Sequence, residues 1–191
     1  MTSAGTTQAV ERGAPRGGLV AGAAAATVAG AATLLDITIG SLTGADPGVL
    51  PRTAVERFEE LGSSSLLGLY HLDFLNALVQ VVTIPIYVAV RAAHLGRGRA
   101  TAGLATALFL VAAAVFLSTN AALPMLQLAR GYEAASSPDA RAALTAAGEA
   151  LLARGAHGTL GALPAFSLTV VAGLTLSVAM LQGRVFLRTT N

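Results

Sequence analysis

Four long apolar stretches limit what this chain can fold into, because each is long enough to cross a lipid bilayer. They span residues 18–42, 66–93, 100–123 and 158–182. A transmembrane helix needs about 20 predominantly apolar residues to cross a hydrocarbon core roughly 30 Å thick. Only 12% of the residues are charged, whereas a typical soluble domain has about 25%. The sequence therefore predicts an all-α integral membrane protein with four transmembrane helices in a bundle.

Composition sets the domain organisation and excludes several classes of function. We expect one transmembrane domain over residues 18–188, a disordered cytoplasmic tail over 1–17 and a short tail over 189–191. The net charge of +2 leaves no basic patch for nucleic acid. The chain has no cysteine, which excludes disulfides and thiolate metal sites.

The arginine distribution predicts the orientation, because short arginine-rich loops stay in the cytoplasm. With the N-terminus inside, the inner segments hold seven arginines and one acidic residue, and the outer segments hold five arginines and seven acidic residues. Both termini are therefore expected to face the cytoplasm, with the chain in a bacterial inner membrane. A cleaved signal peptide is the rival interpretation of the first stretch, but the apolar run continues to Ile39, which favours an uncleaved helix.

Two outer segments have the pattern of short amphipathic helices. Thr53 and Glu56 have the spacing of a capping box, and Gly62 suits a helix end. Ser137 and Pro138 suit the start of a second helix, which Gly155 can end. We expect both helices to lie on the outer surface and to roof the bundle.

Small residues four apart form two rows, and such rows allow close approach of helices in a membrane. The first row lies on the first stretch and the second on the last: Gly18, Gly22, Ala26 and Gly30; Gly161, Ala165, Thr169, Gly173 and Ser177. The rows predict that these two helices pack tightly inside one chain. Homo-oligomerisation through one row is the alternative.

A polar stripe follows the second stretch at steps of three and four residues, and a polar stripe cannot face lipid. It comprises Asp73, Asn76, Gln80, Thr83 and Tyr87. The first stretch has a matching face of Ala29, Thr33, Asp36, Gly40 and Thr43, and we expect the two faces to meet. Asn120, His71 and His157 fall at a similar depth toward the outer leaflet. These polar groups from four helices form the candidate ligand-binding set: Asp36, Asp73, Asn76, Gln80, Asn120, His71 and His157.

The role of the two carboxylates has two interpretations. An intramembrane carboxylate costs at least about 2.5 kcal/mol to insert, so it is typical of sites that handle ions, protons or ligands. A protonated Asp36 or Asp73 would instead be a hydrogen-bond donor that holds helices together. His71 and His157 could ligate haem or a divalent metal, although no further spacing supports such a site. His94, beside Arg91 and Arg99, is expected to face lipid headgroups.

Several segments resemble an uncharacterised family of bacterial multi-pass membrane proteins, classed as a domain of unknown function. The resemblance lies in NAALPMLQLARGYEAASSPDARAALTAAGEALLARGAHGTLG over 120–161, AGLTLSVAMLQGRVF over 172–186 and YHLDFLNALVQ over 70–80. It implies an integral inner-membrane protein and attaches no activity, cofactor or catalytic residue. Members of that family continue into further helices, whereas this chain ends about ten residues after its fourth stretch.

Three functions are compatible with these patterns. We expect a non-enzymatic accessory or sensory component, with the lipid bilayer as its partner. The alternative is an outward-opening binding or transport protein that uses Asp73 and Asp36 to hold a cation, a proton or a small polar or lipid ligand. A haem-binding membrane oxidoreductase is the third.

Overall fold

The computed structural model describes residues 16–43, 53–94, 98–155 and 162–183, and these segments are helical with no strand among them. The helices are α1 (Arg16–Thr43), α2 (Ala54–Ser63), α3 (Ser65–His71), α4 (Phe74–Ala93), α5 (Arg99–Thr119), α6 (Ala122–Ala134), α7 (Pro138–Gly155) and α8 (Leu163–Gly183). The predicted all-α class is confirmed. The predicted tails over 1–17 and 189–191 lie almost entirely outside the described residues, as does His157.

Four segments are long and apolar enough to cross a membrane, as the sequence predicts. They are Arg16–Leu42, Phe74–Ala93, Arg99–Ala134 and Leu163–Gly183. Two predicted boundaries are wrong. The second long helix begins at Phe74 rather than at residue 66. The preceding helix α3 ends at His71, and the left-handed conformation of Asp73 separates it from α4. The third ends at Thr119, and α6 restarts after a break at Asn120 and Ala121.

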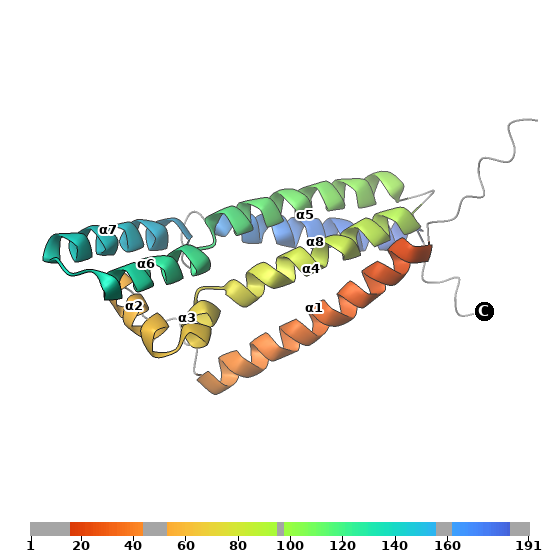
Figure 1. Cartoon of the computed structure of the whole chain (residues 1–191). Helices are drawn as coiled ribbons and strands as arrows, with labels where there is room; N and C mark the ends of the chain where they lie inside the picture. The colour runs from red at the N-terminus through yellow and green to blue at the C-terminus, as the bar shows by residue number, and fades with distance from the viewer. Residues whose placement is uncertain (1–15, 44–52, 95–97, 156–161, 184–191) are drawn as a thin grey trace, which may run out of the picture.

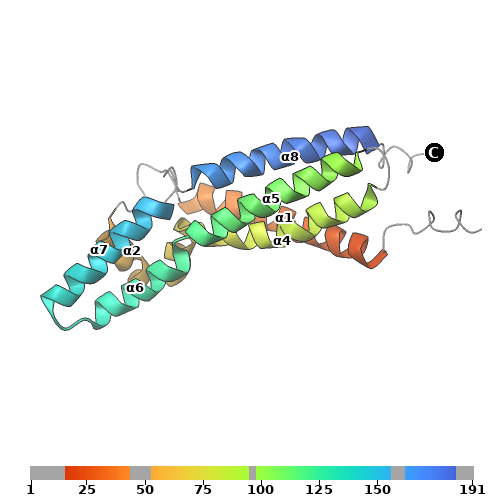
Figure 2. The ribbon, with the colours of Figure 1, turned by 90° about the horizontal axis from the view of Figure 1, so that it is seen from above.

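The long helices lie side by side in the order α1, α4, α5, α8 (Figure 1, Figure 2). The two rows of small residues therefore do not meet: α1 packs on α4, and α8 packs on α5. On α1 only Gly22 of its row is buried, whereas Gly18, Ala26 and Gly30 are exposed. The expected packing of the first helix against the last is therefore wrong.

The contact between α1 and α4 depends on glycine at position 22. A Cβ atom there would lie only 2.2 Å from the Cβ of Ala89 and 3.3 Å from the carbonyl oxygen of Pro85. Because real carbon atoms approach to about 3.5–4.0 Å, the two helices can sit this close only without that side chain. The half-buried residues Ala29, Asp36 and Gly40 continue the packed face of α1, as predicted, but Thr33 is exposed.

The polar stripe on α4 does not face α1. Tyr87 stacks on Phe109 of α5 with 4.2 Å between the ring centroids, in a cluster with Ala105, Ala113 and Ala172. The hydroxyl of Thr106 on α5 also donates to the carbonyl of Tyr87 at 3.3 Å. Residues 85 and 89 contact α1, and position 87 lies roughly 200° around the helix from each of them. The prediction that the stripe meets the first helix is therefore wrong.

The helices α2, α3, α6 and α7 form a separate cap at one end of the long helices (Figure 1). The cap has its own core, which includes Phe58, Leu61, Met125 and Leu152. α2 begins with the predicted capping box, since Glu56 N donates to Thr53 Oγ1 and Thr53 N donates to Glu56 Oε2. Both predicted helices are present and pack into this core rather than lying flat as a roof. α2 is amphipathic, as predicted, whereas the apolar residues of α7 are spread around the helix, so its predicted amphipathic pattern is wrong.

The opposite end of the long helices carries the start of α1 and the last residues of α8 (Figure 2). His94 follows α4 at this end and is only 1% exposed. Its Nδ1 donates to the carbonyl of Val90 at 2.7 Å. The expectation that His94 faces lipid headgroups is therefore wrong.

Candidate functional site

Two clusters of polar side chains lie where the cap meets the long helices. The first, called the junction cluster, comprises Asp73, Asn76 and Asn120. The second, called the cap triad, comprises Arg57, Glu60 and His71. Together they contain four of the seven residues that the sequence predicts for a ligand site.

The junction cluster begins at Asp73, which joins α3 to α4. Asp73 has φ 61° and ψ 25°, a left-handed conformation that short polar side chains tolerate better than bulky ones. Its Oδ1 accepts a hydrogen bond of 3.0 Å from Nδ2 of Asn76, one turn into α4. The carboxylate thus lies at a helix boundary rather than in the middle of a long helix.

Asn120 occupies the matching break between α5 and α6. Its Nδ2 donates to the carbonyl of Leu72 at 3.2 Å and to that of Asp73 at 3.3 Å, while its Oδ1 accepts from Ala122 N at 3.1 Å. Helix ends expose peptide groups that need partners. One amide side chain therefore satisfies peptide groups on both sides of the breaks.

Asp36 and Gln80 lie apart from the junction cluster. The hydroxyl of Tyr70 on α3 donates to the backbone carbonyl of Asp36 at 2.9 Å and lies over Gly40. Burial raises the pKa of Tyr70, and the negative charge of the Asp36 carboxylate raises it further. Gln80 is half-buried on α4, about one turn beyond Asn76 toward the opposite end.

The cap triad is buried between α2 and α3. Glu60 Oε2 lies 3.0 Å from Nη1 of Arg57, and its Oε1 lies 2.5 Å from Nδ1 of His71. The side chains of Arg57, Glu60 and His71 are 8%, 13% and 8% exposed, respectively. Arg57 and Glu60 are not among the residues predicted from the sequence, although their spacing of three residues on a capped helix is the pattern of an ion pair.

Two nitrogen atoms of the cap triad have no hydrogen-bond partner among the described residues: Nε of Arg57 and Nε2 of His71. A buried ion pair offsets its desolvation only when its geometry and its remaining hydrogen bonds are good. Burial of the cap triad therefore carries a desolvation cost, and Glu60 is the acceptor that both Arg57 and His71 share.

Two cavities lie away from both clusters. One of about 510 Å³ lies between α6 and α7 and is lined in part by Gln127, Leu151 and Arg154. The other, of about 450 Å³, lies at the opposite end of the long helices between α4 and α5. Neither is lined by Asp36 or Asp73.

Of the two histidines predicted to ligate haem or a metal, the structure describes only His71. His71 is bonded to Glu60, and His157 lies outside the described residues. Within the described segments, no three histidine, aspartate or glutamate side chains come together in a way that could hold a metal ion.

Comparison with protein-family models, curated proteins and solved structures finds no match for this chain. The resemblance of residues 120–161 to a membrane-protein family stays a prediction.

Proposed function

We propose that the chain is a four-span protein of the bacterial inner membrane, with both termini in the cytoplasm and the cap on the outer side. Large aliphatic side chains support the insertion. Among the exposed large hydrophobic side chains of the described residues, only Leu66 and Leu123 lie outside α1, α4, α5 and α8. A water-soluble protein rarely leaves apolar patches of such extent uncovered. The described acidic residues lie in the cap or toward it, which supports the orientation.

We further propose that it acts as a non-enzymatic accessory or sensory component, in which the state of the cap is transmitted to the long helices. The observation that carries this proposal is the position of Asn120. Its side chain bonds across the break between α3 and α4 while it sits in the break between α5 and α6. A rearrangement of the cap would change these hydrogen bonds, and α4 and α5 begin or end at them.

Single cysteines test the orientation cleanly, because the natural chain contains none. Ser137→Cys places a thiol in the cap before α7, and Ala100→Cys places one in the first turn of α5. In intact cells a membrane-impermeant maleimide should label Ser137→Cys and should label Ala100→Cys only after the membrane is opened. Equal labelling of both without opening contradicts the proposed insertion.

Hydrogen exchange tests the coupling. Gly148→Ala strains the cap, since the new Cβ would lie 2.7 Å from the Cβ of Ala54 and 2.9 Å from Cζ of Phe58. We expect this change to speed amide exchange over residues 74–80 and 112–119. Adding Asn120→Ala should remove that dependence on the cap. If Gly148→Ala leaves exchange in those segments unchanged, the cap and the long helices are independent and the proposal fails.

Asp36 favours one second candidate, the binding or transport protein. It is half-buried and is the only acidic residue that the described part of α1, α4, α5 and α8 contains. Native mass spectrometry of the detergent-purified protein separates the two functions. A bound species of defined mass, lost on substitution of Asp36, would support a binding protein, whereas a clean apo species would support the accessory component.

A further inference from the structure

The end of the long helices opposite the cap carries a basic hollow. It has a volume of about 450 Å³, within the range of roughly 300–1,000 Å³ usual for small-molecule sites, and lies between the last turn of α4 and the first turn of α5. Arg91 and Arg99 line it together with Ala100 and Gly103. Two guanidinium groups from different helices therefore border one space.

Arg91 lies close to Gly103 of α5. An ideal Cβ at Gly103 would lie 3.7 Å from Nε of Arg91, so the arginine side chain passes directly over the glycine. The side chain of Arg91 therefore lies beside α5, the helix that carries Arg99.

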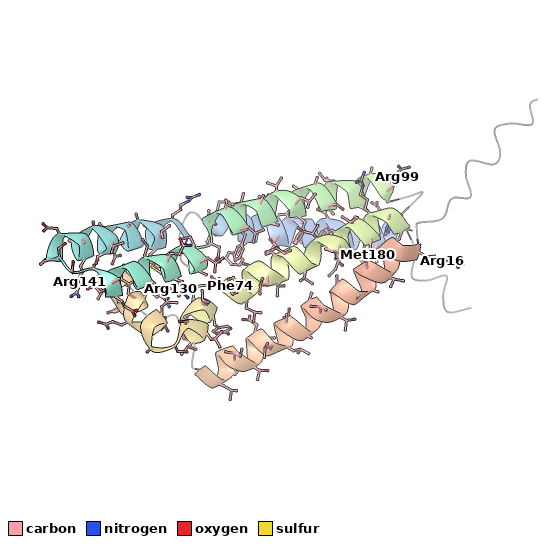
Figure 3. All side chains as sticks on the ribbon, viewed as in Figure 1. Arg16, Phe74, Arg99, Arg130, Arg141 and Met180 are labelled. Carbon is pink, nitrogen blue, oxygen red and sulfur yellow. The ribbon has the colours of Figure 1, made fainter. Side chains whose placement is uncertain are left out.

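Neither arginine is neutralised within the described structure. The salt bridges there join Glu60 to Arg57 and to His71, both in the cap. The side chains of Arg91 and Arg99 are exposed, and neither guanidinium group makes a hydrogen bond to a described residue. Arg16 lies at the same end, whereas Arg130 lies in the cap (Figure 3). The described acidic residues lie in or toward the cap, so this hollow has a net positive surrounding.

We infer that this hollow binds the phosphate of an anionic phospholipid headgroup. Guanidinium groups match phosphate oxygens with paired hydrogen bonds, and basic pockets between helices at the cytoplasmic face are typical headgroup sites. The inference rests on the proposed insertion, since the ends of α4 and α5 then lie at the membrane surface. A zwitterionic headgroup would bring its own cation toward the two arginines, which favours a headgroup without a cation.

Native mass spectrometry with defined lipids tests the inference. The full chain in detergent is titrated with phosphatidylglycerol and, separately, with phosphatidylcholine. We expect tighter binding of phosphatidylglycerol. Arg91→Gln or Arg99→Gln should weaken it about five-fold each, and the double variant about thirty-fold, because one arginine near a membrane surface contributes about a factor of five. Arg130→Gln, an exposed arginine of α6, is the matched control and should leave binding unchanged.

Three results would overturn the inference. Equal binding of the two lipids, or unchanged binding in the double variant, would mean that the hollow does not recognise an anionic headgroup. Displacement of phosphatidylglycerol by an equal concentration of inorganic phosphate would assign the hollow to free phosphate. The maleimide experiment, repeated on the double variant, separates the two proposals: correct insertion without lipid preference removes this inference alone, and failed insertion of the natural chain removes both.

Discussion

Gly22→Ala is the sharpest test of how α1 is held, because the chain offers a matched glycine on the same helix. The new Cβ would lie 2.2 Å from the Cβ of Ala89, whereas a Cβ at Gly30 meets nothing within 4 Å. An ordinary contact needs about 3.5–4.0 Å, so α1 must move away from α4 by roughly 1.5 Å. Overpacking of this kind costs about 1–3 kcal/mol. The gain in helix propensity, up to about 1 kcal/mol, is common to both substitutions and cancels in their comparison.

The assay is thiol labelling in detergent micelles with Ala32→Cys as the reporter. Ala32 is half-buried on the packed face of α1, so its thiol should react mainly when α1 leaves α4. Relative to Gly30→Ala, we expect Gly22→Ala to speed labelling by about 5-fold to 150-fold, which corresponds to 1–3 kcal/mol. Equal rates for the two variants would refute the packing argument. Faster labelling in Gly30→Ala alone would show that the exposed face of α1 makes the important contact.

Three further changes test the cap and its junction. Glu60→Ala leaves Arg57 and His71 buried without their acceptor and should destabilise the cap by about 3–5 kcal/mol in chemical unfolding followed by near-ultraviolet circular dichroism; a loss below about 1 kcal/mol would contradict a buried ionic cluster. Asn120→Ala removes three hydrogen bonds worth about 0.5–1.5 kcal/mol each, so the same measurement should give a loss of about 2–4 kcal/mol, and an unchanged midpoint would argue against the junction. The raised pKa of Tyr70 means that the folded state holds the phenolic proton more tightly than the unfolded state does, so its contribution is complete below about pH 10 and is lost as the pH rises further. The stability of the natural chain relative to Tyr70→Phe should therefore stay constant up to about pH 9 and shrink as the pH rises above about 10, and a constant difference across this range would refute the assigned environment.

The sequence predicts the long helices well because their signal is local. Twenty consecutive apolar residues need no knowledge of their neighbours, and the capping box of Thr53 and Glu56 lies within one turn. The capping box lies where it is predicted, and each long helix falls within or close to its predicted stretch. The ends of α1 agree with the predicted range within two residues.

The helix breaks at Asp73 and Asn120 could not be read in the same way. Neither break contains glycine or proline at its centre, and Pro124 comes only in the first turn of α6, where its missing N–H costs nothing. The spacing of the polar stripe assumes one unbroken helix from residue 66 to residue 93. Because α4 starts at Phe74, Asp73 does not belong to the helix that carries the rest of the polar stripe. At Tyr87 the stripe faces α5, where the tyrosine ring stacks on Phe109.

The cap triad shows a different limit of sequence reasoning. The apolar stretch over residues 66–93 predicts that His71 lies near the start of a transmembrane helix, where a histidine has few protein partners. It lies instead at the end of α3, which folds back on α2 and brings it to Glu60, eleven residues earlier. A pairing across a turn of this kind depends on the fold of α2 against α3, and periodicity along one helix cannot reveal it.

The sequence pattern predicts that Asp36 and Asp73 belong to one ligand site, whereas in the structure their surroundings differ. Asp73 occupies a left-handed helix boundary and accepts from Asn76, so its side chain has a local structural use. Asp36 lies inside α1, where no helix end needs its carboxylate, and the Tyr70 hydroxyl donates to its backbone carbonyl. Retention of a carboxylate at such a position is typical of ligand or proton handling. We therefore expect that any bound species found by native mass spectrometry is lost in Asp36→Asn and kept in Asp73→Asn. Neither substitution should change the free energy of unfolding by more than about 1 kcal/mol, because an amide preserves most of the hydrogen bonds. The opposite pattern, with binding lost only in Asp73→Asn, would return the site to the junction cluster.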